Sequence, residues 1–406
     1  MNFEYKEEYQ YFTNVCLNLT DDCNLACVYC FVQQKPHYME LQTAKDAVDF
    51  VINNCKKAAE LRHIDSPEPA HVTFFGGEPT LMWDKIIVPL VDYVETEYEP
   101  GAVEFTITTN GTLLNKERIQ FLKEHHIFPL LSIDGSEKVQ NLNRPCRNGQ
   151  PSFPLVEKNI PLLLEAFPYT TFRATINQNS CEYVYDSYLY AMTKGFSSIF
   201  FCPNAREEWS EENIQKLQEE VNKMYTYFIM SFMNNLKPIE CIPITRAFRK
   251  ILSHDLQVFS GKYDDVCISR YPVRCGLGSG SASIAYDGKI FGCQEQDSRD
   301  TSDYFYIGDI YNGINKEKHS IMLKDYSEKY EVKCEKPEKC DSCKLRCVCA
   351  YDCCPSVSHD RFNSFQVRPY IDCVWEEMLI NGAITAMHIL VNENNQLFKE
   401  YLDNCL

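Results

Sequence analysis

Residues 21–31, with the sequence DDCNLACVYCF, place Cys23, Cys27 and Cys30 in the pattern C-x-x-x-C-x-x-C directly after the apolar run 15–19. Three thiolates on one short loop can bind three irons of a four-iron, four-sulfur ([4Fe–4S]) cluster and leave the fourth iron without a protein ligand. A cluster that only carries electrons normally has four protein ligands, whereas an open iron can bind a small molecule. Zinc loops and redox-active pairs also use closely spaced cysteines, so the rest of the sequence decides among these sites.

A second motif, FFGGEPTL, follows the apolar run 71–75 and contains Gly76, Gly77, Glu78 and Pro79. Paired glycines let the backbone approach a ligand closely, and a carboxylate can bind an ammonium group. Taken alone, this motif predicts only a polar turn. However, the chain between it and the cysteine loop has the length of one helix and one strand. The two motifs together resemble the radical S-adenosylmethionine (SAM) superfamily. The resemblance implies that the cysteine loop binds the catalytic [4Fe–4S] cluster and that the second motif holds the SAM amino group.

The same resemblance assigns further SAM contacts: Tyr29, Asn110, Ser132, Asp134 and Arg144. Tyr29 matches the aromatic position beside the adenine, and Asn110, in TTNGT, matches a contact to the ribose or methionine part. Ser132 and Asp134 end the expected fourth strand in LSIDG, and Arg144 follows about a dozen residues later. The alternative is that the Asn-Gly and Asp-Gly pairs simply form tight turns.

Apolar strands alternate with amphipathic helical patterns along the first half of the chain. We expect strands at 15–19, 71–75, 104–108, 129–133, 171–176 and 198–201, and helices at 43–59, 84–97, 115–125, 153–167 and 182–194. Such repeats imply a parallel sheet with right-handed crossovers. Six units, without a seventh or eighth, predict the α/β fold of a partial (β/α)6 TIM-like barrel of radical SAM type, with a flat doubly wound sheet as the alternative. Ligands collect at the carboxyl ends of barrel strands, where these candidates lie; Arg173, on the fifth strand, can instead form a buried salt bridge.

A second group of cysteines lies in the last third of the chain. It resembles the SPASM domain, an iron–sulfur-rich extension with little regular structure that carries two auxiliary [4Fe–4S] clusters in many radical SAM enzymes. We therefore expect a radical SAM barrel at 1–204, a bridging helical segment at 205–266, a SPASM domain at 267–374 and a C-terminal helix at 375–406. A zinc-ribbon-like module is the alternative.

The SPASM resemblance also implies a ligand set for each auxiliary cluster. The outer cluster takes Cys340, Cys343, Cys349 and Cys373, and the inner cluster takes Cys275, Cys293 and Cys353. Cys267 supplies the fourth inner ligand; if it does not, an iron is open to a substrate thiolate. Cys334, Cys347 and Cys354 fall outside the pattern and have no assignment.

Composition excludes several classes of protein. The 406 residues include 40 basic and 57 acidic side chains, a net charge of −17 that argues against a general nucleic-acid surface. No apolar run is long enough to span a membrane, and the first residues are too polar for a secretory signal. These features predict a cytoplasmic protein, in which 21 cysteines indicate metal binding over disulfides.

The resemblance implies that SAM is cleaved to methionine and a 5′-deoxyadenosyl radical, which removes a hydrogen atom from an unactivated carbon. We expect a maturase that crosslinks a ribosomally made precursor peptide, joining a cysteine sulfur to a carbon as a thioether. Anaerobic sulfatase maturation, which forms formylglycine, is the nearest alternative. In that family an Asp acts as base directly after the cysteine matched by Cys293, whereas Gln294 stands here and cannot accept a proton. Glu295 is adjacent and is the candidate substitute.

Partners follow from the same resemblance. We expect a precursor peptide and an electron donor such as flavodoxin or ferredoxin. Only 22 residues precede Cys23, too few for an independent leader-binding domain, so leader recognition falls to a separate protein or to the barrel and the C-terminal helix. The alternative from another class is a non-catalytic iron–sulfur electron-transfer or sensing protein, which would not cleave SAM.

Overall fold

The computed structural model describes residues 3–253, 276–299, 302–327, 333–343, 345 and 355–405. It divides into two compact units, each built from separate stretches of the chain: Met1–Ser132, Arg144–Phe167 and Cys275–Lys329 in the first, and Ile133–Asn143, Pro168–Arg274 and Tyr330–Leu406 in the second. Four predicted cluster ligands lie outside the described residues: Cys267, Cys275, Cys349 and Cys353. None of the described helices combines the length and the apolar character that a membrane-spanning segment requires.

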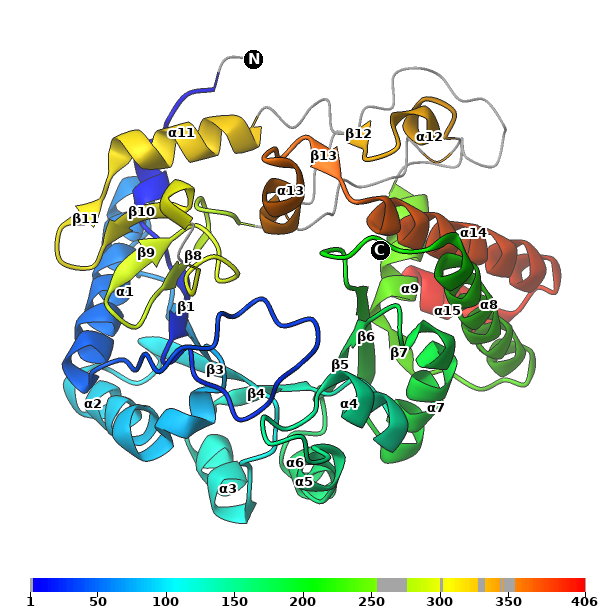
Figure 1. The fold of residues 1–406 in the computed structure, drawn as a ribbon, viewed down its shortest axis with the longest axis horizontal. Helices are drawn as coiled ribbons and strands as arrows, with labels where there is room; N and C mark the ends of the chain where they lie inside the picture. The colour runs from blue at the N-terminus through cyan, green and yellow to red at the C-terminus, as the bar shows by residue number, and fades with distance from the viewer. Residues whose placement is uncertain are drawn as a thin grey trace. The chain divides into compact units, whose positions relative to one another are not determined.

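The first unit is built on a sheet whose central strands are parallel (Figure 1). Its strand order is β11-β10-β9-β8-β1-β2-β3-β4. The strands are β1 (Asn14–Asn18), β2 (Ala70–Phe75), β3 (Val103–Thr109), β4 (Phe128–Ser132), β8 (Ser281–Ile284), β9 (Lys289–Phe291), β10 (Tyr306–Asp309) and β11 (Gly313–Ile314). Strands β8, β1, β2, β3 and β4 pair in parallel, whereas β9, β10 and β11 are added as antiparallel hairpins.

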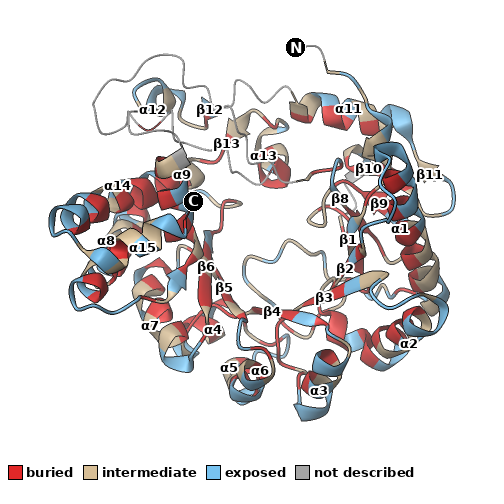
Figure 2. Ribbon diagram, turned by 180° about the vertical axis from the view of Figure 1, so that it is seen from behind, coloured by how far each residue is buried: buried red, intermediate tan, exposed pale blue. Residues whose placement is uncertain are grey.

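The described part of the first unit contains six α-helices. They are α1 (Leu41–Arg62), α2 (Val88–Glu97), α3 (Lys116–Glu124), α5 (Phe153–Glu157), α6 (Ile160–Ala166) and α11 (Lys316–Ser327). Short turns at Glu7–Gln10, Pro79–Met82 and Ser302–Tyr304 and a π-helical turn at Trp83–Ile87 complete the unit. In α1, buried Ala47, Val51 and Ala58 share one face, and the helix residues away from its buried face are intermediate or exposed (Figure 2). Burial of this face stabilises the helix more than its intrinsic propensity does.

The second unit contains a shorter parallel sheet, β5 (Thr171–Ile176), β6 (Ser198–Pro203) and β7 (Glu240–Cys241), and a small pair, β12 (Lys333–Cys334) and β13 (Val367–Arg368). Its helices are α4 (Glu137–Asn143), α7 (Val184–Lys194), α8 (Glu211–Met233), α9 (Ile242–Ser253), α12 (Pro337–Asp341), α13 (Pro355–Phe362), α14 (Tyr370–Asn392) and α15 (Gln396–Asp403), with a 3-10 turn at Cys181–Tyr183.

The long helices of the second unit form its core. Helices α8 and α14 lie side by side (Figure 1), and the Tyr225 hydroxyl of α8 donates to the Leu379 carbonyl of α14 at 2.6 Å. Gly382 makes this approach possible, since an added Cβ would lie 2.2 Å from the Tyr225 ring. Ser210 caps α8 by accepting a hydrogen bond from the Asn213 amide, as the sequence predicts.

The six expected strands are present, but two further parallel strands extend the sheets. Strand β8 pairs with β1, and β7 pairs with β6. Neither strand was predicted, because β7 has two residues and β8 is a short Ser-Ala-Ser-Ile run without strong β propensity. The single helix expected at 153–167 is also wrong: it is split into α5 and α6. Pro161 lacks the N–H needed to continue a helix, and the break precedes it.

Candidate active site

The loop that carries the three cysteines leaves the carboxyl end of β1 and returns to α1. Its base is closed by backbone pairing between its two arms: the Met39 amide donates to the Leu19 carbonyl at 2.9 Å, and the Asp21 amide donates to the His37 carbonyl at 3.2 Å. The Thr20 hydroxyl adds a hydrogen bond to the same His37 carbonyl at 2.7 Å. Both ends of the cysteine loop are therefore fixed to the end of the sheet.

The Gly76–Gly77 pair brings the loop after β2 into direct contact with the cysteine loop. The Gly77 amide donates to the Thr20 carbonyl at 2.7 Å, and the Glu78 amide donates to the Asp22 carbonyl at 2.9 Å. A Cβ on Gly76 would lie 2.3 Å from the Thr20 oxygen, and one on Gly77 would lie 2.2 Å from the Asp22 oxygen. Only glycine permits these contacts, so the pair positions the cysteine loop in addition to the SAM contact that the resemblance implies.

Glu78 is almost completely buried, at 1% exposure, and its carboxylate joins the ends of β2 and β3. One oxygen accepts hydrogen bonds from the Thr80 amide (3.1 Å), the Thr80 hydroxyl (2.5 Å) and the Thr109 hydroxyl (2.8 Å). The other oxygen accepts from the Asn110 amide at 2.8 Å. Burial raises the pKa of the Glu78 carboxyl, and these donors oppose that shift.

Asn110 connects this carboxylate to the first predicted cluster ligand. Its side-chain amide donates to the Asn24 side-chain oxygen at 2.9 Å and approaches the Cys23 sulfur at 3.9 Å. Asn24 in turn donates to the Thr112 hydroxyl at 2.7 Å, and that hydroxyl donates back to the Asn110 side-chain oxygen at 2.6 Å. A continuous polar chain therefore runs from Glu78 to the Cys23 sulfur.

Residues after α4 hold the far side of the cysteine loop. The Ala26 amide donates to the Pro145 carbonyl at 2.8 Å, and Cys23, Leu25 and Cys146 form a small apolar cluster. The Arg144 guanidinium lies over the Tyr29 ring, 5.3 Å from its centroid. The structure thus brings together two predicted SAM contacts that lie 115 positions apart in the chain.

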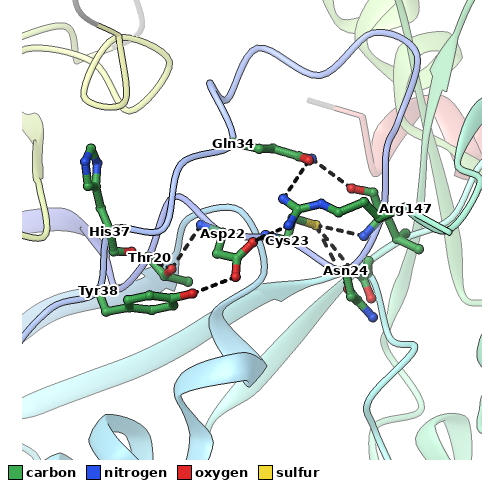
Figure 3. Close-up of polar contacts among 10 residues, drawn as sticks. Thr20, Asp22, Cys23, Asn24, Gln34, His37, Tyr38 and Arg147 are labelled. Atoms are coloured by element: carbon green, nitrogen blue, oxygen red, sulfur yellow. Dashed lines mark hydrogen bonds and ion pairs between the residues drawn. The ribbon is translucent and has the colours of Figure 1, made fainter.

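Arg147 is a loop contact that the sequence analysis missed. It forms an ion pair with Asp22 at 2.8 Å and donates to the Gln34 side chain at 2.9 Å, as Figure 3 shows. The Tyr38 hydroxyl donates to the other Asp22 oxygen at 2.8 Å. No sequence motif marks Arg147, because its partners are set by the fold of the loop.

The three thiols differ in burial along the loop: Cys23 is buried, Cys27 is half-buried and Cys30 is exposed. Burial, with a smaller contribution from the nearby Glu78 carboxylate, raises the pKa of the Cys23 thiol to about 12. Across the described residues, no three His, Cys, Asp or Glu side chains converge as tightly as the ligands of one metal ion. A four-iron cluster spreads its thiolates further apart, and the Asn110 amide near the Cys23 sulfur is a donor of the kind that such clusters use, so these residues fit the group.

Two polar segments meet where β1 and β8 end. Asn18 donates to Asp21 at 3.0 Å and to Asp297 at 3.1 Å, and the Ser283 hydroxyl donates to the second Asp297 oxygen. Burial, with the Asp21 charge nearby, raises the pKa of Asp297 to about 8. Asp297 was not predicted; its only sequence signal is its place four residues after Cys293.

This segment after Cys293 also contacts the cysteine loop. The Arg299 side chain donates to the Phe31 carbonyl at 3.4 Å. Cys293, Gln294 and Glu295 are half-buried. One predicted inner-cluster ligand and the candidate base are therefore in the same unit as the three-cysteine loop.

The other predicted residues are placed as follows. Pro79 begins the turn after Glu78, and Ser132 is half-buried at the end of β4. Asp134 belongs to the second unit, where its carboxylate accepts a hydrogen bond from the Thr175 amide at 3.0 Å. Arg173 is exposed over the Phe200 ring, so the buried salt bridge considered for it is wrong.

Comparison with known proteins gives a family and a fold. The family model described as "Radical SAM superfamily" matches residues 17–182. An uncharacterized protein of Methanocaldococcus jannaschii is 30% identical over 230 residues, 55% of this chain and 74% of the relative. A cysteine-type anaerobic sulfatase-maturating enzyme of Clostridium novyi is 22% identical over 353 residues, 81% of this chain and 85% of the enzyme.

Solved structures share the fold over most of the chain. anSMEcpe with bound AdoMet and Cp18Cys peptide superposes with a TM-score of 0.66 at 19% identity, covering 94% of this chain and 99% of that one. SuiB of Streptococcus suis bound to precursor peptide SuiA superposes with a TM-score of 0.52 at 16% identity, covering 89% and 75%. The expected fold class, an α/β partial barrel of the type found in radical SAM/SPASM enzymes, is confirmed.

Proposed function

Since this chain belongs to the radical SAM superfamily and is an enzyme, we propose that it is a peptide maturase that joins a cysteine sulfur to a carbon within a ribosomally made precursor peptide. The family implies a [4Fe–4S] cluster and SAM as cofactors. The two auxiliary [4Fe–4S] clusters of a SPASM domain are part of the proposal.

The observation that carries the SAM chemistry is the contact between the cysteine loop and the Gly76–Gly77 loop. Two backbone hydrogen bonds and two close glycine approaches hold the C-x-x-x-C-x-x-C segment at the carboxyl end of β1. Cys23, Cys27 and Cys30 would hold three irons of the cluster. When bound, the cluster and SAM together supply a carbon radical that removes a hydrogen atom from the substrate.

The chain's own residues orient and shield this site. The buried Glu78 carboxylate offers negative charge for the SAM ammonium, while its four hydrogen bonds hold it in one position. The Asn110 amide donates toward the Cys23 sulfur. The Arg144 guanidinium, held on the Tyr29 ring, offers donors for the anionic or ribose groups of SAM.

Two observations support a peptide substrate. The structural neighbours that cover most of this chain include one with a bound Cp18Cys peptide and one with the precursor peptide SuiA. The first superposes along 99% of its own length. A fold shared over that length includes the region that follows the barrel, so we assign a peptide substrate to this chain as well.

Gln294 is the reason to prefer a thioether over formylglycine. An amide beside Cys293 cannot act as the base that the sulfatase reaction needs. Asp297 does not replace that base, because both of its oxygens are engaged by Asn18 and Ser283 at 8% exposure. Glu295 is half-buried and is the other carboxylate among the described residues 294–299, and it is our candidate for a catalytic base.

Sulfatase maturation stays as the second candidate function because the Clostridium novyi enzyme matches over 85% of its length. The two functions are distinguished by the product. A thioether makes the peptide about 2 Da lighter and removes one free thiol, whereas conversion of a cysteine or serine to formylglycine produces an aldehyde.

The experiment uses the reconstituted enzyme, SAM, dithionite and synthetic candidate precursors, chosen as short cysteine-rich reading frames found near its gene. Mass spectrometry after thiol alkylation should show the loss of two hydrogens and one alkylation site fewer than in the untreated peptide. A peptide that loses two hydrogens while every thiol is still alkylated would refute the thioether. Flavodoxin or ferredoxin should replace dithionite as the electron donor.

A further inference from the structure

Cys334, to which the SPASM resemblance assigns no role, lies among three predicted ligands of the outer auxiliary cluster. It ends β12 and is 2% exposed. Its amide donates to the Cys340 sulfur at 3.0 Å, and its thiol shares a hydrogen bond with the Cys373 thiol. A buried cysteine whose amide contacts one cysteine and whose thiol contacts another, from a different segment, is not a lone core cysteine.

A third predicted ligand completes the group. Cys343 follows α12, and its amide donates to the Cys340 carbonyl at 3.2 Å. Cys340 and Cys343 therefore lie on one short, hydrogen-bonded turn. Electrostatic interactions of the Cys343 thiol include both Cys340 and Cys334. Four cysteines of the second unit are therefore neighbours, and three of them belong to the pattern expected for the outer cluster.

The β12–β13 pair explains why Cys334 is held there. Cys334 is the register partner of Arg368, and Pro369 then leads directly into α14. Cys373 lies in the first turn of that 23-residue helix, where the helix dipole favours a thiolate. The same two-residue ladder thus fixes both Cys334 and the start of the helix that carries Cys373.

We propose that Cys334 is a ligand of the outer auxiliary [4Fe–4S] cluster and that Cys334, Cys340, Cys343 and Cys373 form its ligand set in place of the set with Cys349. This inference rests on the auxiliary clusters of the proposed function. Each thiol releases its proton to solvent as the thiolate binds iron.

The surroundings of Cys334 suit a cluster ligand. Four thiolates give such a cluster a net negative charge, and the Arg368 guanidinium, 3% exposed, brings a positive charge beside Cys334. The Lys336 amide donates to the Cys334 sulfur at 3.4 Å. Amide donors to ligand sulfurs are among the contacts that set the potential of iron–sulfur clusters.

The test compares single serine variants of the full-length, anaerobically reconstituted enzyme. Wild-type protein should hold about twelve irons for three clusters. Cys334→Ser should either lose about four irons or keep them with shifted g values in the electron paramagnetic resonance (EPR) spectrum of the reduced protein, because serine replaces sulfur with oxygen. Cys349→Ser should keep both the iron content and the spectrum of wild type.

Cys55→Ser is the matched control, since Cys55 is also a buried cysteine but lies in α1 of the first unit. Unchanged iron content and EPR spectrum in Cys334→Ser, together with loss of iron in Cys349→Ser, would overturn the inference. Changes in iron content or spectrum in both variants would overturn the four-residue ligand set. Wild-type protein with only about four irons would instead overturn the auxiliary clusters themselves.

Discussion

Replacing Glu78 by Gln tests the buried network that joins the cysteine loop to the end of β3. A glutamine can keep its oxygen where three donors converge, from Thr80 and Thr109. Its NH2 group would then face the Asn110 amide, now 2.8 Å from a carboxylate oxygen. Two donors would oppose each other in a site that is 1% exposed.

The magnitude follows from the cost of an unsatisfied buried donor. Leaving one buried N–H without an acceptor costs about 1–3 kcal/mol, and hydrogen bonds to a charged group are the stronger kind. At about 2 kcal/mol, local opening becomes roughly 30-fold more frequent. The amide of Asn110 should therefore lose about 30-fold of its protection in hydrogen exchange followed by mass spectrometry.

The SAM site should respond more strongly than the cluster. We expect Glu78→Gln to raise the SAM dissociation constant at least about tenfold, a change of about 1.4 kcal/mol, because it removes the charge available to the ammonium group. Iron content should stay at the wild-type level, since no cysteine changes.

Thr109→Val is the control for packing alone, because it removes one donor to the carboxylate and leaves the charge. It should bind SAM as wild type does. Equal weakening of SAM binding in both variants would refute the reasoning that the Glu78 charge holds SAM, and equal loss of iron would make Glu78 a purely structural residue.

Gly77→Ala should lower the iron content of the three-cysteine site, because its Cβ would lie 2.2 Å from the Asp22 carbonyl oxygen. Gly101→Ala is the control, since Gly101 has a positive φ but open space around it, and this variant should keep the wild-type iron content. Equal iron content in the two variants would contradict the loop-packing argument. Arg147→Ala should cost under about 1 kcal/mol in thermal denaturation, because its ion pair is half-exposed, and a larger loss would mean that it anchors the loop. His319 is buried, and burial lowers its pKa from 6.5 to about 4. Between these pH values the unfolded state binds a proton that the folded state does not, so the free energy of unfolding falls by up to about 3 kcal/mol as the pH drops from about 6.5 to 4. His319→Gln should flatten that part of the melting-temperature profile, and an unchanged profile would show that another group causes it.

Periodic and motif signals predicted the barrel strands and the cysteine loop. The pattern C-x-x-x-C-x-x-C after an apolar run required a loop at a strand end, and β1 ends at Asn18, five residues before Cys23. The pairing of β8 with β1 could not be predicted from the sequence, because the two strands lie about 270 positions apart and the four residues of β8 carry no distinctive pattern.

The roles of individual polar residues needed the fold. Sequence reasoning gave the glycines a ligand-facing role, whereas the structure adds their contact with the Thr20 and Asp22 carbonyls. Asn110 was expected at SAM, and its amide also lies beside the Cys23 sulfur. Such partners come from different strand ends, so local composition does not reveal them. The SAM contacts and the auxiliary-cluster ligands stay predictions.

The most direct test of the central claim follows a hydrogen atom from peptide to cofactor product. The enzyme is reduced anaerobically with SAM and a precursor peptide that is deuterated at its carbon-bound positions, and 5′-deoxyadenosine is analysed by mass spectrometry. A thioether-forming peptide maturase should give 5′-deoxyadenosine that carries one deuterium, together with a peptide that has lost one deuterium and one thiol hydrogen. Formation of 5′-deoxyadenosine without deuterium, with the peptide unchanged, would contradict a peptide maturase.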